Sequence, residues 1–87
     1  MVSRKVVVIN PEGLHMRPAG ELAKFAKSHP DNTIMVCYNG KSTNASSLMA
    51  IMMAGINCGA EVNLEVSGSD EQAVLDALAA KFENGFA

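Results

Sequence analysis

The sequence predicts an α+β fold of two layers, an open-faced sandwich in which a four-stranded antiparallel sheet carries three helices on one face. Stretches with alternating apolar and polar residues are interleaved with stretches whose apolar residues recur at helical spacing, in the order βαββαβα. The alternating stretches keep one polar face, which is typical of an antiparallel sheet covered on one side only. A chain of 87 residues suffices for one core, so residues 1–87 are expected to form a single domain.

The chain begins with a strand and a helix. Arg4–Ile9 is rich in β-branched residues and predicts a strand, which Asn10-Pro11-Glu12-Gly13 ends. Met16–Ser28 predicts a helix with Pro18 in its first turn, where proline costs no hydrogen bond. The pair His29-Pro30 ends this helix, because the residue before a proline avoids the helical region. The apolar residues that recur at helical spacing are Ala19, Leu22, Ala23 and Ala26, with Phe25 beside them.

A hairpin and a short helix come next. Thr33–Tyr38 alternates apolar and polar residues and predicts a strand. Asn39-Gly40 is the strongest short hairpin signal, since a type I′ turn needs positive φ at both positions, and Lys41–Ala45 is the expected returning strand. Ser46-Ser47 can then cap a short helix over Leu48–Ala54, which the following glycine ends.

The last strand and helix carry the clearest patterns. Ala60–Val66 alternates regularly and predicts the fourth strand. Ser69-Asp70-Glu71-Gln72 has the spacing of a capping box and opens the last helix. Gly85 is expected at the C-cap, with Phe86 as the hydrophobic contact that accompanies it. The inner face expected for this helix consists of Ala73, Val74, Ala77, Leu78 and Phe82.

Charge and hydropathy argue against several classes of function. A net charge of −2 without a basic stripe disfavours nucleic-acid binding, and an RNA-binding α+β domain would also need more than one Tyr and three Phe on its sheet. No apolar run approaches the ~20 residues of a membrane span, and the N-terminus lacks the architecture of a signal peptide. We therefore expect a cytoplasmic protein with Cys37 and Cys58 as reduced thiols, and without metal or cofactor.

His15 is the residue whose position indicates chemistry. It lies at the junction of a loop and a helix, beside backbone N–H groups that have no partner within the helix. Those amides and the helix dipole favour an anion, and Arg17 adds a planar guanidinium suited to phosphate oxygens. The same positive field disfavours the imidazolium, so His15 is expected to be neutral and nucleophilic near pH 7.

These residues by themselves leave the role of His15 open. A lone surface histidine next to an arginine is most often only a solvated pair. His29 is the internal contrast, because it precedes a proline at a helix end and has no anion site beside it.

Five segments in order, over essentially the whole chain, resemble one family. They are Gly13-Leu14-His15-Met16-Arg17-Pro18-Ala19, Tyr38-Asn39-Gly40-Lys41-Ser42, Asn44-Ala45-Ser46-Ser47-Leu48-Met49, Gly59-Ala60-Glu61-Val62 and Ser67-Gly68-Ser69-Asp70-Glu71. Together they resemble HPr, the histidine-containing phosphocarrier of the sugar phosphotransferase system. The fold of that family is the βαββαβα sandwich predicted above.

The resemblance implies a phosphocarrier and not a free-standing enzyme. His15 would accept a phosphoryl group on Nδ1 from phospho-enzyme I and pass it to enzyme IIA domains, while Arg17 stabilises the phosphate. A monomer is the default expectation. Two rivals are a paralogue from a nitrogen-related phosphotransfer branch and a regulatory relative that binds a transcription factor; the regulatory relatives lack the histidine that is present here.

The resemblance also marks a regulatory serine and a partner-binding surface. Ser47 fits the serine that a dedicated kinase/phosphorylase modifies for a transcriptional co-regulator, although Ser46 stands where many members have lysine. Met16 departs from the small residue or threonine common in the family. The exposed, partly apolar surface expected to meet partners comprises Met16, Gly20, Lys24, Lys27, Leu48, Met49 and Met52.

Overall fold

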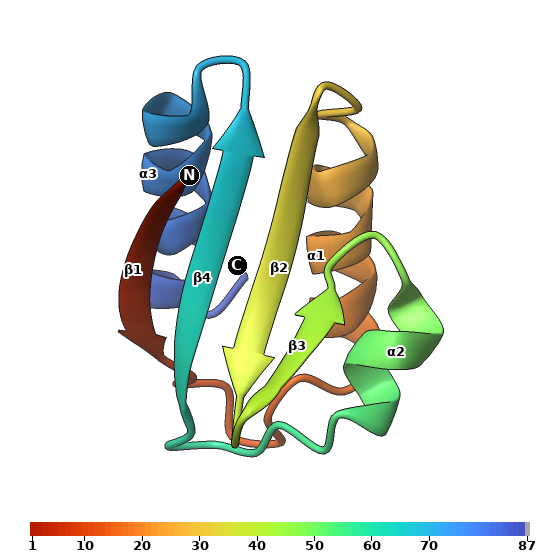
Figure 1. The fold of residues 1–87 in the computed structure, drawn as a ribbon. Coiled ribbons are helices and arrows are strands. Elements are labelled where there is room, and N and C mark those ends of the chain that lie inside the picture. The colour runs from red at the N-terminus through yellow and green to blue at the C-terminus, as the bar shows by residue number, and fades with distance from the viewer. Residues whose placement is uncertain (87) are drawn as a thin grey trace.

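Seven elements follow one another in the predicted order in the computed structural model, which describes residues 1–86 (Figure 1). Their bounds differ from the predicted ones by at most two residues. The first strand, for example, begins and ends two residues early, because its pairing with the fourth strand starts at Val2 opposite Val66. The elements are β1 (Val2–Val7), α1 (Met16–Lys27), β2 (Asn32–Tyr38), β3 (Lys41–Asn44), α2 (Leu48–Met53), β4 (Glu61–Gly68) and α3 (Glu71–Glu83).

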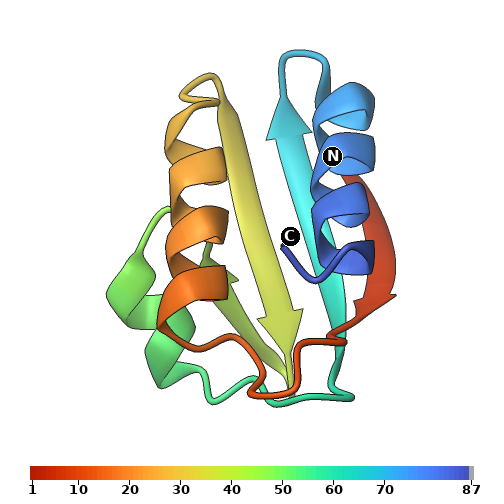
Figure 2. The same cartoon turned by 180° about the vertical axis from the view of Figure 1, so that it is seen from behind.

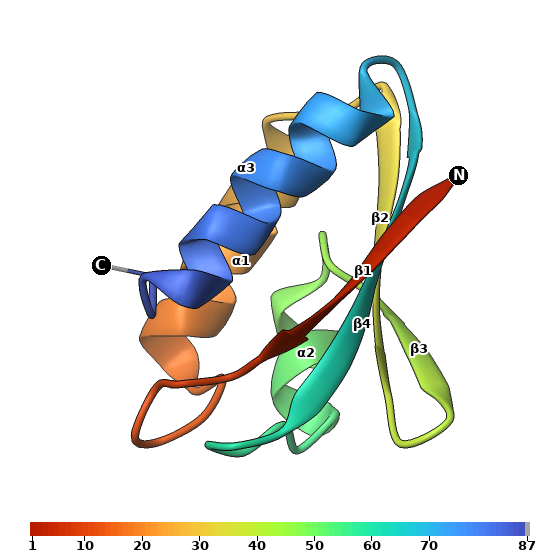
Figure 3. The same cartoon turned by 90° about the vertical axis from the view of Figure 1, so that its left-hand side faces the viewer.

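The four strands form one antiparallel sheet in the order β1-β4-β2-β3, and the helices cover one face of it (Figure 3). Helix α3 packs on β1 and β4, α1 on β2, and α2 on β3 and α1. Strand β4 buries Val62, Leu64 and Val66 against the helices, as its alternation predicts. The α+β sandwich expected from the sequence is therefore confirmed.

The buried face of α1 carries the apolar residues that recur at helical spacing, but the inner face of α3 is rotated from the predicted one. Ala73 and Ala77, which the sequence analysis placed in the core, are exposed. Leu75 and Ala79 are buried in their place. The buried stripe runs through Val74, Leu75, Leu78, Ala79 and Phe82. The larger side chain of Leu75 removes more apolar area from water than Ala73 or Ala77 would, which favours this rotation of the helix.

The predicted capping box at the start of α3 is absent. The N-cap is Asp70, with φ of 49° and no side-chain bond to the helix. Glu71 instead lies 2.9 Å from the N-terminal amino group of Met1. The hydrogen bond and the charge of that amine hold the pKa of the Glu71 carboxyl below its usual value. Gln72 donates to Asp76 within the helix.

The end of α3 is formed as predicted. Gly85 has φ of 64°, and its N–H donates to the carbonyl of Phe82. The N–H of Phe86 donates to the carbonyl of Lys81 at 2.8 Å, which completes a Schellman motif. The Phe86 ring is buried edge-on against Phe82, with 4.8 Å between the centroids. The chain therefore folds back over the helix in a fixed turn.

Two loops meet at the end of the sheet where α1 begins (Figure 2). The N–H of Leu14 donates to the carbonyl of Ile56 at 2.9 Å, and the N–H of Gly59 donates to the carbonyl of Val8 at 2.7 Å. Gly13 has φ of 71°, and a Cβ there would collide with the Ile56 carbonyl. This close backbone contact fixes the residues that lead into α1.

Replacement of Gly13 should therefore be costly where replacement of another glycine is not. We expect Gly13→Ala to lower the free energy of unfolding by about 2–4 kcal/mol, through backbone strain and the collision with Ile56. Gly20→Ala is the control, because Gly20 lies within α1 with no atom near a built Cβ, and it should raise stability by about 0.5–1 kcal/mol. Urea unfolding of both variants tests the pair, and equal effects would contradict this account.

Candidate functional site

His15 occupies the N-cap of α1, where the sequence analysis placed it. Its backbone is extended, with φ of −80° and ψ of −164°. The imidazole makes no capping hydrogen bond and is exposed to solvent. The ring nitrogens are therefore accessible to another molecule, as a group that reacts with large partners requires.

The backbone beneath His15 presents donors without acceptors. The first hydrogen bond of the helix runs from the N–H of Ala19 to the carbonyl of His15 at 2.9 Å. The N–H groups of Met16 and Arg17 precede it, and within residues 1–86 neither donates to another group. Because α1 is 12 residues long, its dipole adds to the positive potential of these amides. An anion attached to His15 is stabilised at this position.

Arg17 is exposed next to His15, but its guanidinium has an unexpected partner. Its Nη1 donates to the backbone carbonyl of Phe86 at 2.9 Å, across 69 positions of sequence. A guanidinium has five N–H donors, so most of them stay free for phosphate oxygens. A surface depression of about 270 Å³ joins His15, Met16 and Arg17 to the loop of Asn10-Pro11-Glu12-Gly13.

Ser46 and Ser47 have different local roles. Ser47 is the N-cap of α2, and its Oγ accepts from the N–H of Ala50 at 3.2 Å. The Oγ of Ser46 donates to Asn44 Oδ1 at 2.7 Å. The predicted cap is thus Ser47, which confirms one of the two serines that the sequence offered.

The apolar surface differs in part from the expected one. Met49 is 69% exposed and Met52 is 39% exposed, as expected for a contact surface. Leu48 is half-buried and packs against the core, so it contributes less than the sequence analysis assumed. Met53 was missed, although it is 78% exposed and lies one helical turn after Met49. Met16 is also largely exposed.

The residues of α1 expected to meet partners are not all close to His15. Helix α2 lies beside the N-terminal half of α1 (Figures 1 and 2). Gly20, which is half-buried, lies in that half of α1. Lys24 and Lys27 are exposed in the last turn of α1, and Lys27 is about 18 Å from His15 along the helix axis. The two lysines therefore lie outside the immediate surroundings of the imidazole.

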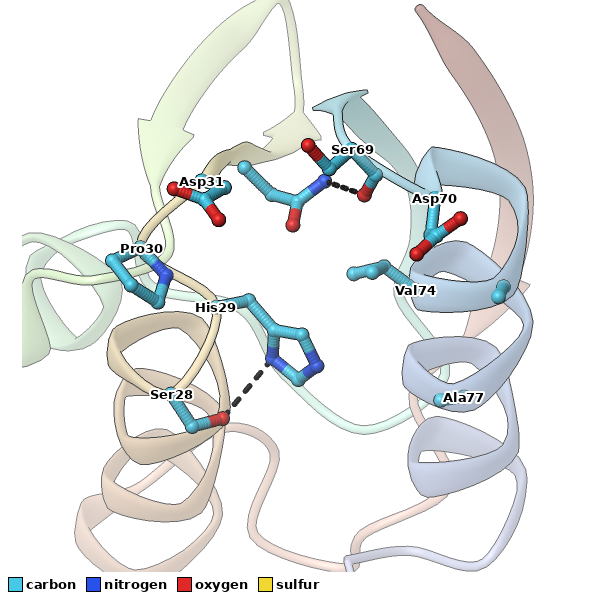
Figure 4. Close-up of a pocket in the computed structure, with 10 residues that line it drawn as sticks. Ser28, His29, Pro30, Asp31, Ser69, Asp70, Val74 and Ala77 are labelled. Atoms are coloured by element: carbon cyan, nitrogen blue, oxygen red, sulfur yellow. Dashed lines mark hydrogen bonds between the residues drawn. The ribbon is translucent and has the colours of Figure 1, made fainter.

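His29 lies at the other end of α1, in a depression of about 390 Å³ between the helices (Figure 4). Its Nδ1 is 2.9 Å from the carbonyl of Phe25, which can only accept, so Nδ1 carries the hydrogen. The carboxylates of Asp31 and Asp70 line the same depression. This negative lining disfavours an anion, in agreement with the contrast drawn between the two histidines.

Other kinds of site have little support in the described part of the chain. Within residues 1–86, no three His, Cys, Asp or Glu side chains are placed to hold a metal ion. None of the helices there is long and apolar enough to cross a membrane. Cys37 and Cys58 are free thiols.

Comparison with known proteins agrees with this geometry. Residues 2–84 match the family described as "PTS HPr component phosphorylation site". Phosphocarrier protein HPr of Treponema pallidum is 40% identical over 86 residues, which cover 99% of this chain and 97% of that protein. Phosphocarrier protein NPr of Proteus mirabilis is 32% identical over 83 residues, which cover 95% of this chain and 92% of that protein.

Solved structures share the whole fold. A crystal structure of HPr from Thermoanaerobacter tengcongensis has a TM-score of 0.92 at 34% identity, covering 99% of this chain and 96% of that one. An HPr dimer from the same organism has a TM-score of 0.76 at 33% identity, covering 100% of this chain and 99% of that one. The family match, the curated relatives and the shared fold agree, and the chain belongs to the HPr family of phosphocarrier proteins of the phosphotransferase system.

Proposed function

We propose that His15 carries the phosphoryl group, which it accepts from phospho-enzyme I in the cytosol and passes to enzyme IIA domains. One observation supports this above the others: the exposed His15 is the N-cap of a 12-residue helix whose first two N–H groups donate to no other group within residues 1–86. The chain acts as a carrier and not as a free-standing enzyme, since the exposed His15 suits contact with another protein's active site.

The transfer needs only groups that are present at this site. A neutral ring nitrogen of His15 attacks phosphorus, and the bond from phosphorus to the donor's leaving atom breaks as the new phosphorus–nitrogen bond forms. The donor keeps the electron pair of the broken bond. The amides of Met16 and Arg17 and the Arg17 guanidinium then stabilise the dianionic product. The second transfer reverses these roles, with His15 as the leaving group.

A nitrogen-related branch of phosphotransfer is the second candidate, because the chain is 32% identical to a phosphocarrier protein NPr. The chemistry at His15 would be the same and only the partners would differ. Purified phosphoryl donors from each branch, compared for transfer rate to the same chain, distinguish the two.

Loss of His15 should abolish phosphorylation without loss of fold. With enzyme I and phosphoenolpyruvate, the wild-type chain should gain one acid-labile phosphate, and His15→Ala should gain none. The free energy of unfolding should change by no more than about 0.5 kcal/mol, because the side chain is exposed. Mass spectrometry at neutral and acidic pH measures the phosphate. Phosphorylation of His15→Ala at the wild-type rate would overturn the assignment.

We assign partner contact to the exposed methionines of α2, and Ile51 in the same helix provides the control. Met49→Ala should weaken binding of enzyme I and change stability by no more than about 0.5 kcal/mol. Ile51→Ala should cost about 2–5 kcal/mol, because that side chain is fully buried. Calorimetric titration and urea unfolding measure the two effects. A large stability loss in Met49→Ala would assign that residue to the core.

Ser47 is the proposed site of regulatory modification, on the basis of the family resemblance and its place at the start of α2. A phosphate there carries about −1.5 to −2 charges beside Met49 and Met52, and its desolvation would oppose docking. The dedicated kinase and the transcriptional co-regulator belong to the same proposal.

Ser47→Asp should imitate part of this effect. We expect slower phosphorylation of His15 with an unchanged melting temperature, because aspartate is also a good N-cap. Ser46→Asp is the matched control one residue away. If only Ser46→Asp slows the transfer, the other serine is the regulatory one. If neither does, the segment serves only as a helix cap.

A further inference from the structure

The turn after α3 is bonded to the loop and helix that carry His15. Asn10 Nδ2 donates to the carbonyl of Gly85 at 2.7 Å. Arg17 Nη1 donates to the carbonyl of the next residue, Phe86, at 2.9 Å. Two consecutive carbonyls of one turn thus accept from two residues on either side of His15.

The backbone of that turn is held by hydrogen bonds and by a buried side chain, so its two carbonyls move together. The Schellman hydrogen bonds from Gly85 and Phe86 fix its backbone to α3, and the buried Phe86 ring holds it against the core. A shift of the Gly85 carbonyl therefore moves the Phe86 carbonyl with it. The guanidinium of Arg17 moves with the Phe86 carbonyl, because it donates a hydrogen bond to that carbonyl.

Asn10 is well placed to hold this turn. It is only 8% exposed, so its side chain has little freedom. Its own carbonyl accepts from the N–H of Gly13 at 2.9 Å, which ties it to the loop before His15. Because the Gly85 carbonyl can only accept, the amide nitrogen must point toward it. The Oδ1 atom is buried and accepts from no group within residues 1–86, so the donor to Gly85 is the useful end of this side chain.

We propose that Asn10 is a positioning residue for phosphoryl transfer. Through the carbonyls of Gly85 and Phe86 it holds the Arg17 guanidinium beside His15, where the charge of the phosphoryl group develops. A long arginine side chain that is already held in place needs less ordering during the reaction. This inference rests on the proposed role of His15 as the phosphoryl acceptor.

The chain contains a matched control at the opposite end of α3. Asn32 Nδ2 donates to the carbonyl of Ser69 at 2.7 Å, just before that helix begins. Its geometry resembles that of Asn10 with Gly85, but it lies at the end of α1 remote from His15. If these hydrogen bonds only stabilise the ends of α3, removal of either asparagine should have similar consequences. Displacement of the Arg17 guanidinium should result only from removal of Asn10.

The test is a double-mutant cycle on the rate of phosphorylation by enzyme I and phosphoenolpyruvate. We expect Asn10→Ala to slow transfer by about three- to tenfold in the wild-type background, and by less than about twofold in the Arg17→Ala background. Asn32→Ala should transfer at the wild-type rate. Asn10→Leu, which keeps about the size of the side chain but removes the donor without adding a charge, should be slowed as Asn10→Ala is, so the test does not depend on one variant folding well.

The outcomes separate this inference from the proposed function. If the wild-type chain gains no phosphate from enzyme I and phosphoenolpyruvate, the role of His15 is overturned, and this inference with it. Normal wild-type transfer with an unchanged rate in both Asn10 variants would overturn only the positioning role. Equal slowing of Asn10→Ala with and without Arg17, or equal slowing in Asn32→Ala, would likewise reject it, since the effect would then not pass through Arg17.

Discussion

The hydrogen bond from the Leu14 amide to the Ile56 carbonyl is the contact on which the placement of His15 depends. It joins the loop that precedes α1 to the loop that precedes β4, and it requires Gly13 because only a residue without Cβ fits so close to that carbonyl. Leu14 is buried directly before His15, so the backbone is anchored on one side of the histidine and enters α1 on the other. The imidazole therefore lies outside the core, on a backbone whose position is fixed on both sides.

A site of this kind is built from backbone more than from side chains. The amides of Met16 and Arg17 are lost only on substitution by proline, and both residues line a surface depression beside the exposed His15. A deep pocket would exclude water better and strengthen each electrostatic contact. It would also prevent two different proteins from reaching the same imidazole in turn. The exposed position of His15 is therefore the arrangement expected of a carrier, whose partners can supply the remaining walls of the site.

Local patterns predicted well what depends on neighbours in sequence. The position of His15 at a helix start, the Asn39-Gly40 hairpin with φ of 54° and 79°, and the glycine turn after α3 each follow from the chemistry of a few adjacent residues. The buried face of α3 was predicted wrongly at two places, where Leu75 and Ala79 are buried instead of Ala73 and Ala77. Helical spacing alone does not show that burying a leucine side chain removes more apolar area from water than burying an alanine. Contacts across 69 and 75 positions, from Arg17 to Phe86 and from Asn10 to Gly85, have no local signal at all.

The surface around His15 offers a way for related carriers to share one chemistry and still meet different partners. In the proposed function the acceptor site needs a histidine, a helix start and a cation, and these do not distinguish a sugar branch from a nitrogen branch. The surrounding surface can distinguish them, since Met16, Met49, Met52 and Met53 are exposed and make no demand on the core. Methionine adapts its shape to several apolar partners, so under the proposed function changes at these positions would alter docking at little cost to folding. Selection on partners can therefore act on this surface while the loop contact at Gly13 and the placement of Arg17 stay fixed.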